Sequence, residues 1–149
     1  MNYLTDQEFA CAFERCEIPN DQFRHRDHLR LAWIYLRRYG RPQAGTRIAE
    51  SIQRYAAHHR ATAKYHETVT LAWMELVACA MRSLPDTAGF DEILEAFPHL
   101  LQKSALAQYY SSGVLESETA RRVFVQPDLK PLCPLDAPMA LSQDRPAGN

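Results

Sequence analysis

The sequence predicts an all-α protein: an antiparallel bundle of four main helices, followed by short helices and an extended proline-rich tail. Apolar residues recur every three or four positions through much of the chain, as on the buried face of a helix. Helix-capping residues separate these stretches. The chain has 149 residues, of which 46% are hydrophobic, so it can bury a core of its own. We expect a single domain over residues 1–140 and a frayed tail over 141–149.

The first two helices are bounded by capping residues. Thr5 and Glu8 have the spacing of a capping box, which predicts a helix over residues 6–16. The second helix is expected to start within residues 23–26. It should end before Gly40, because glycine readily adopts the left-handed conformation that closes a helix.

A third and a fourth helix follow. Pro42 suits the first turn of the third helix. Neither glycine nor proline interrupts residues 58–65, yet one helix over 46–84 would be about 58 Å long at ~1.5 Å per residue. A compact domain of this size cannot hold it. We therefore expect a break near Thr62 and a fourth, most apolar helix over 64–83 at the centre of the bundle.

Shorter elements are predicted in the C-terminal half. Helices are expected over residues 90–97, 98–110 and 117–125. Prolines then recur at short intervals, at Pro127, Pro131, Pro134 and Pro138. They predict an extended tail, whose first part packs on the body through Leu129, Leu132 and Leu135.

The charge balance limits the partners. The formal net charge is −1, so no overall field attracts nucleic acid or an anionic membrane. We expect neither as a partner. The sequence is compatible with binding of a small molecule and with formation of a homo-oligomer.

Localisation and cysteine chemistry are linked. The N-terminus lacks the basic and apolar regions of a signal peptide, and no segment has the ~18–20 apolar residues of a membrane span. We therefore expect a cytoplasmic protein. The four cysteines show no C-x-x-C spacing and are expected to be reduced thiols in that compartment. They are Cys11, Cys16, Cys79 and Cys133.

The histidines are the strongest functional signal. Five of the six lie between positions 25 and 66, around the predicted ends of three helices. If these helices are antiparallel with short connections, one helix start, one helix end and another start lie at the same end of the bundle. Four imidazoles then face a common pocket, because each shares a face with an apolar stripe of its own helix. They are His25, His28, His59 and His66.

A metal site is one interpretation of these histidines. Imidazoles from different helices can bind a transition metal and leave a coordination position open for water or substrate. His25, His28 and His66 are the first ligands that the arrangement predicts. His59 or Glu67 would be the fourth, and zinc and ferrous iron both suit such ligands.

A metal-free site is the second interpretation. A histidine would then act as a general base, oriented by a carboxylate such as Asp27 or Glu67. Glu67 and the neighbouring Tyr65 are the candidate catalytic side chains. The third interpretation is structural, with imidazoles that cap helices or donate to backbone carbonyls in an inert network.

The second helix supports a different function, a non-catalytic interaction module. Its basic face would meet an acidic partner, although a solvated helix surface shows the same pattern. The arginines concerned are Arg24, Arg26, Arg30, Arg37, Arg38 and Arg41.

Three segments resemble a family of small uncharacterised bacterial helical proteins. They are Phe23–Leu29, Lys64–Thr70 and Pro127–Leu129, and the resemblance spans residues 20–132. No activity is attached to that family. The resemblance therefore implies no catalytic role and only draws attention to the histidines in the first two segments.

Overall fold

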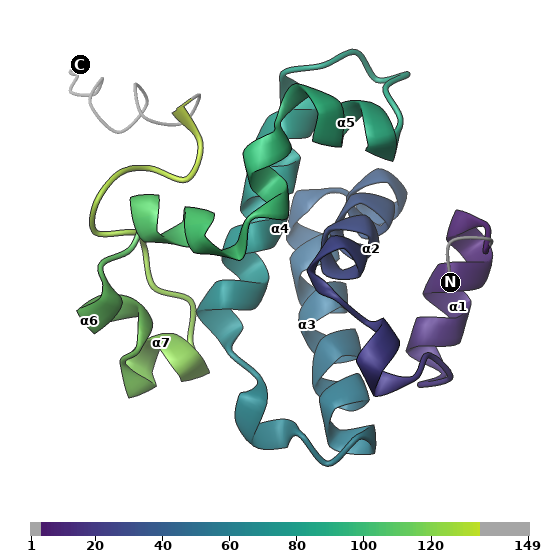
Figure 1. Cartoon of the computed structure of the whole chain (residues 1–149), viewed down its shortest axis with the longest axis horizontal. Coiled ribbons are helices and arrows are strands. Elements are labelled where there is room, and N and C mark those ends of the chain that lie inside the picture. Colours follow the sequence, from purple (N-terminus) through teal and green to yellow (C-terminus); the bar gives the residue numbers. More distant parts are fainter. Residues whose placement is uncertain (1–3, 135–149) are drawn as a thin grey trace.

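The structure is a computed structural model that describes residues 4–134. Within them every regular element is a helix, which confirms the predicted all-α class. The three longest helices pack against one another: α2 (His25–Tyr39), α3 (Arg41–His58) and α4 (Glu67–Arg82). The shorter α1 (Asp6–Glu14) packs on α2 and α3, on the side away from α4 (Figure 1).

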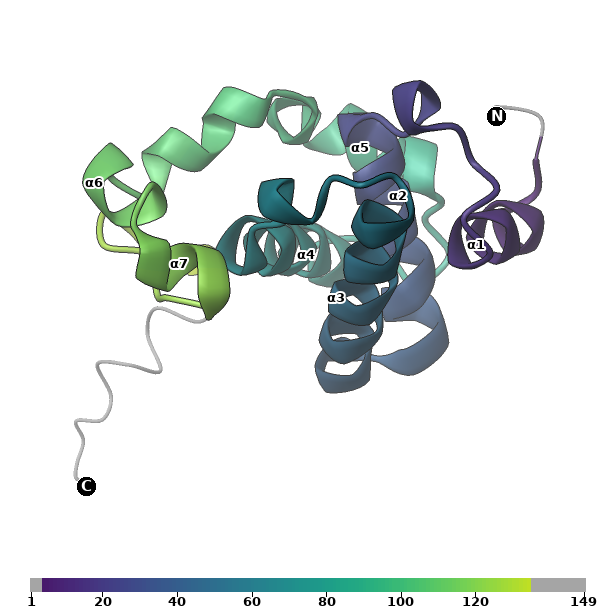
Figure 2. The same cartoon turned by 90° about the horizontal axis from the view of Figure 1, so that it is seen from below.

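The remaining helices of residues 4–134 are short, and most of them lie in the second half of the chain. Three are α-helical: α5 (Phe90–Ala96), α6 (Ser112–Leu115) and α7 (Glu118–Arg122). Four are 3-10 helices: η1 (Asn20–Gln22), η2 (Thr62–Lys64), η3 (Pro98–Leu101) and η4 (Lys103–Gln108). Figure 2 shows the η3–η4 segment arching from α5 to α6, with α4 alongside. The chain then returns to α4 through α7.

The predicted capping signals are present. The Thr5 hydroxyl accepts a hydrogen bond from the Glu8 N–H, and the Glu8 carboxylate accepts one from the Thr5 N–H. Gly40 has a φ of +82°, the left-handed region that lets the chain leave α2 and start α3 at once. The first helix ends at Glu14, earlier than the predicted Cys16, because Cys16 itself has a φ of +59°.

The predicted break between the third and fourth helices is confirmed. Helix α3 ends at His58 and α4 begins at Glu67, with η2 between them. Arg60 turns the chain with a φ of +57°. In Figure 1, α3 descends to this turn and α4 climbs back beside it.

The prediction of one α-helix over residues 98–110 is wrong. Residues 98–108 form η3 and η4, separated by Gln102 in an extended conformation with φ −101° and ψ 113°. The buried side chains of this stretch are Leu100, Ala105, Leu106, Tyr109 and Tyr110. A straight α-helix would not point all of them at α2 and α4, so tertiary packing overrides the local preference.

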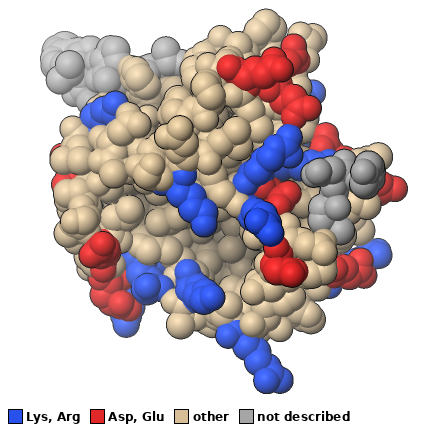
Figure 3. All heavy atoms as spheres, in the orientation of Figure 1, with Lys and Arg blue, Asp and Glu red and all other residues tan. Residues whose placement is uncertain are grey.

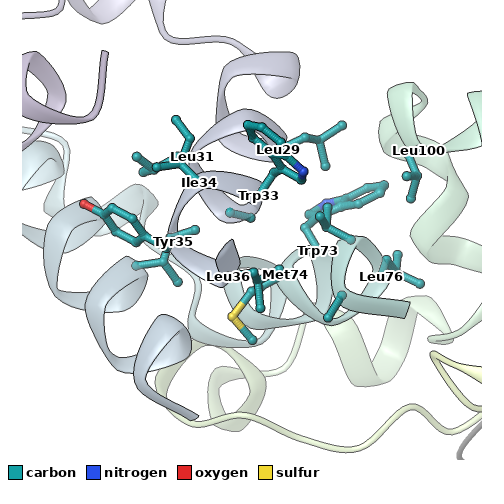
Figure 4. Packing of buried hydrophobic residues seen from close by; sticks show 14 of the residues in the cluster. Leu29, Leu31, Trp33, Ile34, Tyr35, Leu36, Trp73, Met74, Leu76 and Leu100 are labelled. Carbon is teal, nitrogen blue, oxygen red and sulfur yellow. The ribbon is translucent and has the colours of Figure 1, made fainter. Parts of the chain in front are cut away.

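Helices α2 and α4 both lie at the centre of the molecule. The sequence predicted a central position for α4 only. Residues 31–36 of α2 are buried without interruption. Figure 4 shows Trp73, Met74 and Leu76 of α4 packing beside Leu29 and Leu36 of α2. A helix that is covered almost all round belongs to the core rather than to the surface.

The segment after α7 packs on the body only in part. Leu132 is buried, whereas Leu129 is 55% exposed although its N–H donates to the Tyr109 carbonyl. Leu135 and the predicted frayed tail over 141–149 lie outside the described residues.

The prediction of four reduced thiols is wrong for one pair. Cys79 of α4 and Cys133 form a disulfide with a Cα–Cα distance of 5.6 Å. Cys11 and Cys16 are free. The partners stand 54 residues apart, so only the return of the chain over α4 brings them together.

The surface carries charges of both signs. In Figure 3 blue and red side chains are scattered between larger tan areas, and neither sign covers a large area of the visible face. Within residues 4–134, no helix combines the length and the apolar character that crossing a bilayer requires.

Candidate functional site

The best-formed candidate site is a mostly apolar pocket of about 550 Å³ between the N-terminus of α2, the first half of α4 and the η4–α6 segment. We call it the α2–α4 pocket. Its walls are formed by Phe23, Arg24, His25, His28, Val69, Trp73, Lys103, Ser104, Leu106, Ala107, Tyr110, Ser112, Leu115 and Glu116.

Local structure explains how three segments supply these walls. Val69 and Trp73 stand four residues apart on α4, so they share one helix face. His25 and His28 stand three residues apart at the start of α2 and also share a face. The third wall comes from η4 and the residues after it, which the Tyr110 hydroxyl anchors by donating to the Val125 carbonyl at 2.7 Å.

His25 lies in the pocket wall. Its ring contacts the indole of Trp73, with the ring centroids 4.4 Å apart. Its Nε2–H donates to the Leu100 carbonyl at 2.8 Å, so Nδ1 is the remaining lone pair. Burial lowers the pKa of His25, the Leu100 hydrogen bond opposes that shift, and the positive charge of Lys103 adds to it. The ring is therefore neutral at pH 7.

His28 lines the same pocket and has the most perturbed ring. Burial lowers its pKa to about 4, repulsion from His25 adds to the shift, and the nearby Thr70 carbonyl opposes it. Its Nε2 atom is sealed from solvent and has no hydrogen-bond partner. The ring stacks on Phe23 at a centroid distance of 6.4 Å. Burying a polar nitrogen without a partner costs about 1–3 kcal/mol.

His66 is not among the lining residues, and both of its ring nitrogens are occupied. It is the N-cap of α4, where Nδ1 accepts a hydrogen bond from the Val69 N–H at 3.1 Å. Its Nε2–H donates to the Leu115 carbonyl at 2.8 Å. No lone pair is left for a metal, so His66 holds the start of α4 and the α6 wall together.

His59 lies apart from the pocket. It is the C-cap of α3, with its ring 4.4 Å from that of Tyr55. Tyr55 contacts Phe23, which in turn contacts His28, so two aromatic rings stand between the two histidines. The structure therefore brings two of the four predicted histidines together in the pocket, and the other two support its surroundings.

The residues described, 4–134, contain no group of three or more His, Cys, Asp or Glu side chains arranged to hold a metal ion. The geometry of two predicted ligands agrees with this. His66 has no free lone pair, and the ring of His59 packs against that of Tyr55. Binding of zinc or iron stays a prediction from the sequence.

Tyr65 and Glu67 pair with each other, outside the α2–α4 pocket. The Tyr65 hydroxyl donates to the Glu67 carboxylate at 2.6 Å. Burial and this hydrogen bond raise the pKa of Tyr65 to about 12. Glu67 instead lines a second hollow of about 430 Å³ with Arg41 and Glu75, which form an ion pair at 2.7 Å. The predicted catalytic pair therefore does not face the histidines.

The basic face of α2 is largely engaged within the molecule. Arg26 pairs with Asp91 at 2.8 Å, and Arg30 pairs with Asp6 at 3.0 Å. Arg37 donates to the Asp86 carbonyl at 3.1 Å. These contacts tie α2 to α1 and to the α5 region, so the arginines have structural roles that the sequence did not reveal.

Sequence reasoning missed one wall of the pocket. The sequence predicts a helix over residues 98–110, which contains Leu106 and Tyr110, and it assigns no role to Leu115. The four-residue spacing of Leu106 and Tyr110 is a local signal that both face one way. Nothing in the sequence indicates that they face the first turn of α2, about 80 residues earlier, since that depends on how the chain folds back.

The resemblance of Phe23–Leu29 and Lys64–Thr70 to small bacterial proteins stays a prediction. Comparisons with protein-family models, curated proteins and solved structures gave no match.

Proposed function

We propose that this protein binds a small, largely apolar molecule in the α2–α4 pocket. The observation that carries the proposal is a hollow of about 550 Å³ with mainly apolar and aromatic walls and two neutral imidazoles. Small-molecule sites typically have volumes of ~300–1,000 Å³ and few, well-placed polar groups.

The burial of His28 supports the proposal. Its Nε2 atom lacks a partner, and its lowered pKa shows how unfavourable the charged form is there. A phenylalanine would stack on Phe23 without an unsatisfied nitrogen. A strongly perturbed titratable group in a cleft is more frequent at functional sites than elsewhere. The accessible part of the ring, rather than the sealed Nε2 atom, is where we expect a ligand to contact His28.

His25 has the chemistry for the same task. Because its Nε2–H is used by the Leu100 carbonyl, a ligand would meet Nδ1, which accepts a hydrogen bond when the ring is neutral. Trp73 against the ring supplies a flat apolar surface. His25 thus offers a polar contact beside the apolar surface of Trp73.

A fluorescence titration tests the proposal. The chain has two tryptophans. Trp73 lines the α2–α4 pocket, whereas Trp33 lines a different hollow. In a Trp33→Phe variant, Trp73 is the only indole. Titration with the neutral apolar dye N-phenyl-1-naphthylamine should quench Trp73 emission by energy transfer, saturating at one dye per chain.

A pair of variants locates the binding. Ala107 lines the pocket and is exposed, so Ala107→Phe should fill the hollow without disturbing the core and weaken dye binding about tenfold. Ala57 is an exposed residue of α3 outside the pocket, and Ala57→Phe is the matched control. Equal dye affinity in both variants would contradict the proposal.

A further inference from the structure

Two cationic side chains line the α2–α4 pocket, Arg24 and Lys103. Both residues are exposed, and they come from different segments, one immediately before α2 and the other at the start of η4. The charge of Lys103 reaches His25, whose pKa it helps to lower. The cations therefore lie at the polar edge of a mostly apolar hollow.

Neither cation is neutralised within residues 4–134. No ion pair or side-chain hydrogen bond involves the Arg24 guanidinium or the Lys103 ammonium there. Asp27 lies close to Arg24, but its carboxylate accepts from the Arg24 backbone N–H at 2.9 Å. By contrast, Arg26, Arg30 and Arg41 each hold a carboxylate.

Charges of the other sign are few at this edge. Glu116 is the one carboxylate among the lining residues, and it is exposed and forms no ion pair with Lys103. The remaining ionisable groups are His25 and His28, which are neutral at pH 7, and Tyr110, whose pKa burial raises to about 12. The charged side chains that line the pocket therefore sum to +1.

The apolar part of the pocket faces the same space. Val69, Trp73 and Leu106 supply aliphatic and aromatic surface from two walls. A ligand that matches both parts has an apolar body and an anionic head. A carboxylate suits the head, because a guanidinium binds its two oxygens with two parallel hydrogen bonds and an ammonium adds a third.

We infer that the ligand of the α2–α4 pocket is a single-chain amphiphile with a carboxylate head, bound by Arg24 and Lys103, and an apolar tail against Val69, Trp73 and Leu106. The inference rests on the proposed function, since it names the ligand class for that pocket. The volume of about 550 Å³ is sufficient for one short chain.

Calorimetry with two probes of equal length tests the inference. Octanoate and octanol share their apolar tail and differ in the head group. With the full chain at pH 7.5 and low salt, octanoate should bind at least tenfold more tightly than octanol. Added salt should weaken octanoate binding selectively, because the cations are exposed.

Variants assign the head-group contact. Arg24→Gln combined with Lys103→Gln should remove the tenfold preference and leave octanol affinity unchanged, with thermal melts checking the fold. Lys64 is an exposed lysine outside the pocket, so Lys64→Gln is the matched control and should keep the preference.

The outcomes separate the two claims. Equal affinity of the unaltered protein for octanoate and octanol would overturn the carboxylate inference and leave a neutral pocket ligand standing. A preference for octanoate that persists in the double variant would also overturn it. Failure of octanol, octanoate and the neutral dye to bind at all would overturn the proposed function as well.

Discussion

The imidazole of His25 lies 4.4 Å, centroid to centroid, from the indole of Trp73, and the two rings meet at 68°. One ring begins α2 and the other stands in the middle of α4. The contact joins the two central helices where they border the α2–α4 pocket. It also places a titratable group beside a fluorophore.

Trp73 emission should therefore report the protonation of His25. A protonated imidazole quenches a contacting indole, and burial lowers the pKa of His25 below its ordinary value of 6.5. In Trp33→Phe, emission should fall on acidification with a midpoint below pH 6.5. His25→Gln should abolish that transition. A midpoint above 6.5, or an unchanged transition in His25→Gln, would contradict the geometry.

His28 should make the protein acid-sensitive. Its pKa is about 4 in the folded state and about 6.5 in the unfolded state, so on acidification the unfolded chain takes up the proton first. The contribution of neutral His28 to stability is intact above pH 6.5 and is lost between 6.5 and 4. The loss amounts to about 3 kcal/mol by linkage.

Urea unfolding at a series of pH values measures this. The free energy of unfolding of the unaltered protein should decrease across that window more than that of His28→Phe, which keeps the stacking on Phe23 and has no proton to bind. Carboxylates titrate alike in both proteins, so the difference isolates His28. Parallel pH profiles would show that the ring is not held neutral by burial.

Tyr35 links the first three helices through its hydroxyl. It donates to the Glu14 carboxylate at 2.5 Å and lies 3.0 Å from the buried Ser51 hydroxyl, which can donate to it in turn. Tyr35→Phe leaves both partners without that contact. We expect a loss of about 1–2 kcal/mol in the free energy of unfolding.

Chemical denaturation checks the Tyr35 prediction. Tyr39 is a less buried tyrosine of the same helix, and its hydroxyl makes no hydrogen bond within residues 4–134. Tyr39→Phe is therefore the control and should change stability by less than about 0.5 kcal/mol. Equal effects of the two substitutions would mean that the Glu14–Tyr35–Ser51 contacts do not stabilise the fold.

The Cys79–Cys133 disulfide should stabilise the protein against unfolding. It closes a loop between residues 54 positions apart, and cross-links of this kind contribute about 2–4 kcal/mol, in part by restricting the unfolded chain. Reductant should lower the denaturation midpoint accordingly. Thiol counting under denaturing, non-reducing conditions should find two of the four cysteines free.

A matched pair of variants controls the disulfide prediction. Cys133→Ser should be less stable and insensitive to reductant. Cys11→Ser removes a free thiol and should keep the sensitivity of the unaltered protein. Four reactive thiols in the non-reduced, denatured chain would show that the pair is not linked.

Local sequence signals determined most of the helix boundaries. The Thr5–Glu8 box starts α1 because two side chains three residues apart satisfy backbone N–H groups of the same turn. Gly40 ends α2 because it tolerates a positive φ. The clustering of histidines at helix ends could also be predicted, since it depends only on where each helix starts and ends.

Tertiary structure alone decided which of those histidines share a pocket. Whether His66 keeps a free nitrogen depends on the Leu115 carbonyl, 49 residues away, and whether Cys79 is oxidised depends on Cys133. Periodicity reports only which face of its own helix a side chain occupies. The partners across that face are set by how the short C-terminal helices fold back over α4, through burial that no local pattern encodes.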